Sequence, residues 1–306
     1  MRKITINKID SLFVAVDYFE HIIATSANDS LTLDFSNATF LRNHYLSVIG
    51  MGLEVLRKQN IKIDIVPPSD TKVLISMKKI GFLSVFGKHG DGADTYRTMI
   101  KYTNIPLRDY DKPLQEFYIY FMQQIQGKVG NLSPKLLNKI LQKILELFSN
   151  VFRHSESEVG LFCSGQFYPN SDKFNFTIVD NGVTIKNNVN NYLKKKFKSD
   201  RNFSDKIMGK KFQPLSAEEA IKWALEDKNS STGEGGLGLS LLMDLISLSK
   251  GSIEIISNNG YYSIKNGTEY ITSLESSFEG TVISIQLNTD DRHYYFLKEE
   301  RKNDNN

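Results

Sequence analysis

The chain has 306 residues, which is long enough for two domains that each bury a core of their own. Hydrophobic residues make up 40% of it and charged residues 24%, the composition of a globular protein rather than of a fibrous or disordered chain. The net charge of +3 is too small to indicate nucleic-acid binding through bulk charge, and a single cysteine excludes an intramolecular disulfide. Because no apolar run approaches about 20 residues and no signal-peptide core is present, we expect a cytoplasmic protein without a membrane span.

The first part of the chain predicts a compact α/β unit over residues 1–100. Apolar and polar residues alternate over 31–35 as in a half-buried strand, and helical spacing follows over 45–59. A second strand is predicted over 61–66, ended by two prolines, and an amphipathic helix over 71–80. Residues 101–133 are then predicted to be a largely helical connector, with a helix over 114–126.

The second part predicts an α+β domain over residues 134–290, followed by a tail over 291–306. Helices are expected over 134–153, where Ser133 precedes a proline at the first helical position, and over 217–226 and 240–249. Strands are expected over 158–167, 173–179, 252–257, 270–274 and 281–287. Since helices and strands do not alternate, we expect the helices to pack on one face of a mixed, mostly antiparallel sheet.

Three polar residues recur every four positions on the predicted helix 134–153. Glu146, Asn150 and His154 lie on one stripe, because a step of four residues drifts only about 40° around a helix axis. Apolar residues occupy much of the remaining surface of this helix. The stripe is either a solvated face or one wall of a site, and taken alone it does not decide between them.

A carboxylate and a glycine follow directly on the predicted strand 173–179. Asp180, Asn181 and Gly182 would lie at the strand end, where Asp or Asn before Gly is also common turn chemistry. Further along, a glycine-rich segment precedes the predicted helix 240–249; its residues are Gly233, Gly235, Gly236, Leu237, Gly238 and Leu239. Glycines that free backbone N–H groups before a helix N-terminus form a cradle for phosphate, although the spacing is neither that of a Walker loop nor a convincing dinucleotide fingerprint.

These segments together resemble a known family. The order of Glu146, Asn150 and His154, then Asp180 and Gly182, then the glycine-rich segment, then Gly280 and Thr281, is similar to the GHKL ATPases, whose nucleotide site is the Bergerat fold. The family includes gyrase, the ninety-kilodalton heat-shock chaperone, histidine kinases and the MutL proteins. The resemblance covers about half of the chain and implies that ATP and Mg²⁺ are bound there.

The resemblance also implies a role for each matching residue. Asn150 would coordinate Mg²⁺ through its amide oxygen, an atom type that Mg²⁺ prefers. Asp180 would accept a hydrogen bond from the adenine amino group with support from Thr281, and Gly182 would let the backbone approach the base. His154 would line the phosphate side or cap the helix. The glycine-rich segment, with its two leucines, would form the phosphate-facing end of a lid over the nucleotide.

Glu146 bears on the type of reaction. In hydrolytic members of the family a glutamate at this position polarises the attacking water, whereas typical histidine kinases carry asparagine there. Serine kinases of the anti-sigma-factor type also have this glutamate. The chain departs from the family pattern at Thr184, where the first glycine box usually ends in a second glycine.

The expected lid between Thr184 and Gly233 is long and basic. Its cations are Lys194, Lys195, Lys196, Lys198, Arg201, Lys206, Lys210 and Lys211. Such a run is either a solvated loop or a surface that contacts phosphates or an acidic partner. Trp223 is expected in the core of the helix 217–226.

The first 100 residues resemble a STAS domain, the fold of anti-sigma-factor antagonists. The stretch from Arg42 to Tyr45 stands where phosphorylatable members carry their acceptor serine, so that serine is absent, and His44 is expected to be a surface or packing residue. We therefore expect an ATP- and Mg²⁺-binding regulator that acts through a protein partner, with a homodimer possible and neither membrane nor nucleic acid indicated. A serine/threonine kinase acting on a separate STAS-type antagonist, and a slow ATPase, are the enzymatic alternatives.

Overall fold

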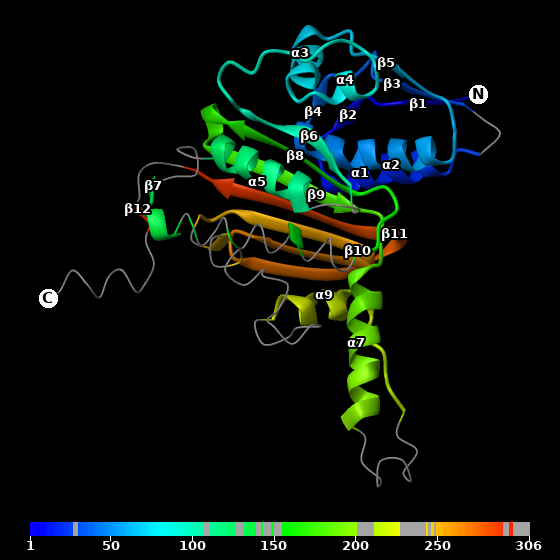
Figure 1. Cartoon of the computed structure of the whole chain (residues 1–306), viewed down its shortest axis with the longest axis vertical. Coiled ribbons are helices and arrows are strands. Elements are labelled where there is room, and N and C mark those ends of the chain that lie inside the picture. The colour runs from blue at the N-terminus through cyan, green and yellow to red at the C-terminus, as the bar shows by residue number, and fades with distance from the viewer. Residues whose placement is uncertain are drawn as a thin grey trace, which may run out of the picture.

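The computed structural model describes residues 1–26, 30–106, 111–125, 131–136, 138, 142, 148–149, 155–200, 211–226, 243, 246–247, 249–289 and 294–295. These residues form a mixed α and β structure with two main sheets. A three-stranded sheet lies in the N-terminal unit and a five-stranded sheet lies in the remainder (Figure 1). Within the described part, no helix is long and apolar enough to cross a membrane.

The N-terminal unit is built on a parallel sheet in the strand order β1-β3-β5. Its elements are β1 (Arg2–Thr5), β2 (Lys8–Ile9), α1 (Leu12–Ile23), β3 (Leu31–Asp34), β4 (Phe40–Leu41), the 3₁₀ turn η1 (Asn43–Tyr45), α2 (Leu46–Lys58), β5 (Ile63–Val66), α3 (Thr71–Lys79) and α4 (Phe82–Val85). The predicted elements over 31–35, 45–59, 61–66 and 71–80 are confirmed, whereas β1 and α1 were not predicted. Side-chain caps begin two of the helices: Ser11 accepts from the backbone N–H of Val14, and Asp70 accepts from that of Val73.

The five-stranded sheet is antiparallel throughout, in the order β10-β11-β9-β8-β6. Its strands are β6 (Met99–Ile105), β8 (Leu161–Tyr168), β9 (Lys173–Asp180), β10 (Ser252–Lys265) and β11 (Thr268–Asn288). The predicted division at residue 100 runs through β6, which forms the edge of this sheet beside β8 and was not predicted as a strand. A short parallel pair, β7 (Asn131–Leu132) with β12 (Tyr294–Tyr295), also forms.

The strands predicted over 252–257, 270–274 and 281–287 are confirmed in position, but the last two are parts of one strand. They belong to a single long hairpin, β10 and β11, whose turn contains Asn266 and Gly267. Both residues are left-handed, with φ of 52° and 77°, a geometry that Asn-Gly adopts in tight hairpin turns. The pairing register shifts between Ser257 and Gly260, and the additional residues are on β11, between Ser273 and Thr281.

Helices that follow β6 in the chain pack on one face of the five-stranded sheet. They are α5 (Asp111–Ile125), α9 (Ala217–Leu225) and the start of α7 (Ile185–Asp200), through Ile185 and Val189. Within the predicted helix 134–153, residues 134–136, 138, 142 and 148–149 are described and helical, and the Ser133 hydroxyl accepts from Leu136 N–H at 3.1 Å, as expected of a cap. Among the described residues of the predicted helix 240–249, 243 and 246–247 are helical.

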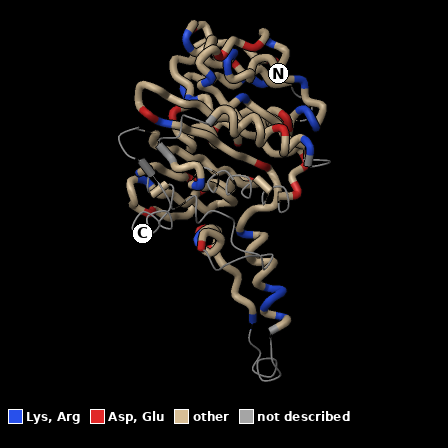
Figure 2. Tube along the Cα trace, turned by 60° about the vertical axis from the view of Figure 1, so that its left-hand side comes forward, with Lys and Arg blue, Asp and Glu red and all other residues tan. Residues whose placement is uncertain are grey.

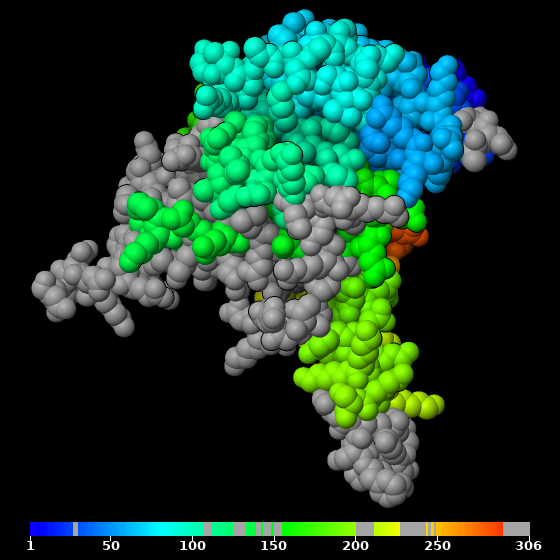
Figure 3. Space-filling view, in the orientation of Figure 1, coloured from blue at the N-terminus to red at the C-terminus, as the bar shows by residue number. Residues whose placement is uncertain are grey.

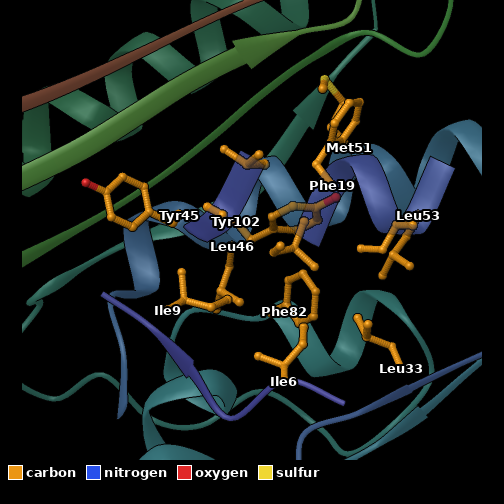
Figure 4. Packing of buried hydrophobic residues seen from close by; sticks show 14 of the residues in the cluster. Ile6, Ile9, Phe19, Leu33, Tyr45, Leu46, Met51, Leu53, Phe82 and Tyr102 are labelled. Carbon is orange, nitrogen blue, oxygen red and sulfur yellow. The ribbon is translucent and has the colours of Figure 1, made fainter. Parts of the chain in front are cut away.

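The other face of the same sheet is covered by the N-terminal unit, whose helices α1 and α2 lie between the two sheets (Figure 1). One continuous core therefore joins the unit to the sheet residues Phe162, Val179, Ile256, Phe278 and Val282. Figure 4 shows the centre of this core, where Phe82 of α4 and Leu46 of α2 point toward Ile6 and Ile9.

The expected basic lid begins as a helix. Lys194, Lys195, Lys196 and Lys198 lie on α7, which projects from the body of the molecule (Figures 2 and 3). The segments 201–210 and 227–233 of the expected lid, and the glycine-rich segment that follows it, are outside the described residues. The helix predicted over 217–226 is confirmed as α9, which begins with a reciprocal capping box between Ser216 and Glu219. Trp223 of α9 is half-buried, and its ring lies 5.8 Å from that of Tyr192.

Candidate functional site

The described part of the predicted site is centred on Asp180, the last residue of β9. Antiparallel pairing sets Asp180 between Leu161 of β8 and Thr281 of β11. Alternation along β9 turns its side chain to the face that carries the helices, the same face as Ile178 and Phe176. The residue is 2% exposed, so a carboxyl group is fixed in an apolar environment at one end of the sheet.

The carboxyl group of Asp180 is incompletely satisfied by its surroundings. Its Oδ1 accepts a hydrogen bond from Gly182 N–H at 2.8 Å, and the described part of the chain shows no other hydrogen bond to this side chain. Burial raises the pKa of Asp180 to about 7 from an ordinary value of 3.8, and the bond from Gly182 opposes that rise only in part. Because each carboxylate oxygen can accept more than one hydrogen bond, the group retains capacity for a donor.

Gly182 is held against the end of the preceding helix. A Cβ at this position would overlap the backbone carbonyl of Ser155, so a side chain is excluded there by contact. The neighbouring Val183 N–H donates to the same carbonyl oxygen. The turn after β9 is therefore docked on Ser155, the residue that follows His154 in the sequence.

Thr281 takes part in a buried hydrogen-bond network beside Asp180. Its hydroxyl lies 2.9 Å from the hydroxyl of Ser257, which lies on β10 directly opposite. Ser257 Oγ also lies 2.8 Å from Gly280 O and accepts from Ile185 N–H at 2.9 Å. The network thus ties the strands β10 and β11 to the first residue of α7.

Gly280 explains the close approach of β11 to the turn. Its φ is +124°, and a Cβ there would overlap the carbonyl oxygen of Asp180. A glycine is required at this point for both reasons.

The structure gives a reason for the threonine at position 184. Its Oγ1 accepts from Asn187 N–H at 3.3 Å, so Thr184 caps the N-terminus of α7. A glycine there would lack this hydroxyl. The departure from the family pattern therefore coincides with the start of a helix.

Sequence reasoning missed three serines that organise the site. Ser257 and Ser155 make the contacts given above, and Ser157 Oγ lies 2.5 Å from Asn181 Oδ1, which fixes the residue between Asp180 and Gly182. Serine carries no periodic signal that would distinguish it on a strand or at a helix end. Strands were predicted over 252–257 and 281–287, but their pairing, which sets Ser257 opposite Thr281, was not.

The remaining predicted site residues lie outside the described residues. They are Glu146, Asn150, His154, Gly233, Gly235, Gly236, Leu237, Gly238 and Leu239. The structure thus brings Asp180, Gly182 and Thr281 together and leaves the other predicted members as predictions.

His44 of the N-terminal unit is a packing residue. It is 2% exposed and lies against Tyr45, with the ring centroids 4.1 Å apart. Burial, together with the charge of Arg42, lowers its pKa to about 3, so the ring is neutral at physiological pH.

Comparison with known proteins gives little further information. No model of a known protein family matches the sequence, and no curated protein matches it. Among solved structures, the chain is similar to the ATP-binding domain of topoisomerase IV from Francisella tularensis, determined in complex with a small-molecule inhibitor. The two are 12% identical, with a TM-score of 0.26, over 68% of this chain and 47% of that one.

The matched region thus spans less than half of the topoisomerase chain. A likeness at this TM-score carries no argument about function. None of these comparisons supports the STAS resemblance of the first 100 residues.

Proposed function

We propose that the C-terminal half binds ATP with Mg²⁺ and that the bound nucleotide regulates contact with a protein partner. The observation that carries the proposal is the buried carboxyl group of Asp180, positioned by Gly182 and flanked by Thr281 at one end of the sheet. The proposal also rests on the sequence resemblance to the GHKL ATPases.

The chemistry of Asp180 suits recognition of an adenine. A carboxylate in an apolar surrounding gains from a neutral N–H donor such as an exocyclic amino group, because the unpaired charge is costly. Guanine has a carbonyl oxygen at the same place. That oxygen and the carboxylate are both hydrogen-bond acceptors, so they cannot pair. Adenine is therefore preferred to guanine at this position.

The contacts of Ser155 support the placement of the predicted metal and phosphate residues. This residue follows the predicted stripe directly, and its carbonyl group contacts the turn after Asp180. By helical spacing, Asn150 would lie about one turn back along that helix and Glu146 one turn further. Asn150 would hold Mg²⁺, which draws phosphate oxygens toward itself when bound, and the glycine-rich segment together with His154 would contact phosphate.

The direct test is calorimetric titration of ATP, ADP and GTP, with and without Mg²⁺. Wild type should bind ATP more tightly than GTP, and Asp180→Asn should weaken ATP by about 1–3 kcal/mol, or roughly 5- to 150-fold, because the contact with the amino group is lost. Asp172→Asn is a matched control, since Asp172 is exposed at the opposite end of β9 and precedes it. Equal affinity for ATP and GTP, or wild-type affinity in Asp180→Asn, would refute the assignment.

The same preparation separates a regulator from an enzyme. With γ-labelled ATP, free phosphate indicates an ATPase, label on an added protein indicates a kinase, and neither supports the regulator. If turnover is present, Glu146→Ala should reduce it by about 10²–10⁴-fold while ATP affinity stays within a few-fold. Loss of ATP binding in that variant would mean that Glu146 has a structural role.

A further inference from the structure

A cavity of about 230 Å³ lies between the N-terminal unit and the five-stranded sheet. Its walls come from the segment that contains η1 and from strands β9, β10 and β11, and they include Arg42, His44, Tyr45, Asn175 and Glu254. A single water needs only about 10–15 Å³ on the same measure. The space is therefore large enough for a small organic molecule.

This cavity is separate from the site around Asp180. Asn175 and Asp180 both lie on β9, but they are five residues apart, about 17 Å along a strand. Strand alternation turns them to opposite faces: Asp180 shares the face that carries the helices, and Asn175 shares the face covered by the N-terminal unit.

Three polar groups in the walls of the cavity are buried without a hydrogen-bond partner in the described part of the chain. They are the Nε of Arg42, the Nδ1 of His44 and the Oδ1 of Asn175. His44 and Asn175 are each 2% exposed. Each of these three atoms has almost no accessible surface, so an occupant would meet the charged side chains of the walls instead.

The walls carry charges of both signs, and Arg42 and Glu254 have different hydrogen-bond partners. Glu254 is held by two tyrosines, with the hydroxyl of Tyr261 at 3.0 Å and that of Tyr45 at 3.4 Å from its carboxylate oxygens. Arg42 has no carboxylate within 4.0 Å among the described residues, and Asp10 of the same wall pairs with Lys8 at 2.6 Å. His44 is neutral and adds no charge.

These groups define what the occupant must offer. A guanidinium group presents parallel N–H donors that match the two oxygens of a carboxylate. The carboxylate of Glu254 accepts hydrogen bonds and matches an ammonium group. An occupant with one carboxylate and one ammonium group would therefore pair with both Arg42 and Glu254.

We propose that this cavity binds a free amino acid or a close relative, with its carboxylate on Arg42 and its ammonium group on Glu254. The site lies between the two parts of the molecule, so the ligand contacts both and stabilises their docked arrangement. It does not depend on nucleotide binding, and Asp180→Asn should leave it unchanged.

The test uses the full chain, the twenty standard L-amino acids and their hydroxy-acid analogues where these exist. Thermal shift at 10 mM identifies a ligand, and calorimetry then measures its affinity. We expect at least one amino acid to bind, and we expect Arg42→Gln and Glu254→Gln each to weaken it at least tenfold. Arg57→Gln is the matched control: Arg57 lies on α2, outside the cavity, and pairs with Glu54, so its replacement should leave the affinity unchanged.

Each other outcome contradicts the proposal. If no amino acid shifts the transition at 10 mM, or if affinity survives Arg42→Gln, the site is not an amino-acid site. If inorganic phosphate or a hydroxy acid binds as tightly as the matching amino acid, and Glu254→Gln has no effect, the ammonium assignment is wrong. Should Arg42→Gln fail to fold, Arg42→Lys keeps the charge without the paired donors and is expected to lose at least fivefold in affinity.

Discussion

The two faces of the five-stranded sheet are built from the same strands but are covered in different ways. The face toward α5 packs a cluster of phenylalanines, Phe117, Phe121, Phe148, Phe174 and Phe176, whose rings meet at centroid distances of 5.1–6.3 Å. The face toward the N-terminal unit is apolar at one end and polar at the other. There Ser164 accepts from Ser47 N–H at 3.1 Å, and the amide of Asn43 donates to that of Gln166 at 2.8 Å.

This difference shows how one sheet serves two purposes. The phenylalanine face excludes water and holds the helices, and the buried carboxyl group of Asp180 lies at its end. The second face has specific hydrogen bonds that fix the N-terminal unit in one register, and it leaves a polar cavity where the surfaces do not meet. The comparison predicts that both faces contribute to one cooperative fold.

The largest expected effect comes from removing a ring from either face. Phe162→Ala on the N-terminal face and Phe176→Ala on the helix face should each lower the free energy of unfolding by about 3–5 kcal/mol, because both side chains are fully buried. The fluorescence of Trp223 in α9 reports the helix face during denaturation. We expect the Trp223 midpoint to fall in both variants.

Phe40→Ala serves as the control for this pair, because Phe40 is 44% exposed and should cost far less. If Phe162→Ala leaves the Trp223 midpoint unchanged while circular dichroism shows an earlier transition, the two faces unfold independently and the comparison fails.

The next effect concerns the buried carboxyl group on the helix face. The pKa of Asp180 is raised to about 7 in the folded state, so between pH 4 and pH 7 the folded state holds a proton that the unfolded state has lost. Wild type should therefore lose stability as the pH rises through this window. Asp180→Asn avoids the loss and should be more stable than wild type above pH 7, by up to about 4 kcal/mol at about 1.36 kcal/mol per pKa unit.

Denaturant titrations from pH 3 to pH 8 measure this difference. It should be smallest at about pH 3, below the ordinary pKa of 3.8, where both states of the wild type are protonated, and the exposed Asp172→Asn control should show no such trend. If the difference in the free energy of unfolding between Asp180→Asn and wild type is the same at every pH, the pKa of Asp180 is not raised by folding.

The smallest expected effect concerns the packing of α2 on β6, on the face of the sheet toward the N-terminal unit. Gly50 of α2 lies against the ring of Tyr102 on β6, and a Cβ there would overlap that ring. Tyr102 is enclosed by Phe82, Phe86 and Phe162, so the ring has little room to move. Gly50→Ala should lose about 1–3 kcal/mol, although alanine favours helices over glycine by about 1 kcal/mol.

Gly90→Ala is the matched control, since nothing lies within 4 Å of a Cβ at Gly90. A more stable Gly50→Ala variant, measured by denaturant titration, would mean that α2 does not pack closely on β6.

The sequence predicted most elements with a clear period. The elements predicted from alternation over 31–35, from helical spacing over 45–59 and from the apolar run over 173–179 appear in the structure as β3, α2 and β9, whose residues are largely buried. The hairpin β10 and β11 was predicted in pieces, because register shifts near Asn258 interrupt its alternation and its outer half is polar. The helix α7 is rich in lysine and asparagine, and its composition resembles a loop more than a helix.

The position of the candidate site at a strand end could be predicted from the sequence, but the residues that fix it could not. Asp180 and Gly182 follow a strand in the sequence, so their place at a sheet end could be inferred before their contacts were known. The partners that fix them, Ser155 and Ser257, are distant in the sequence and were missed. The cavity beside Arg42 could not have been predicted, because it depends on how the N-terminal unit docks on the sheet.

One consequence follows from the way α7 begins. Its first backbone N–H is bonded to Ser257, which also meets Thr281 beside Asp180, and the rest of the helix projects from the body (Figure 3). A helix of 16 residues is about 24 Å long, so a rotation of about 10° at its base carries the far end through about 4 Å. The base of α7 is thus bonded to the network beside Asp180, and Lys194, Lys195, Lys196 and Lys198 lie toward its far end.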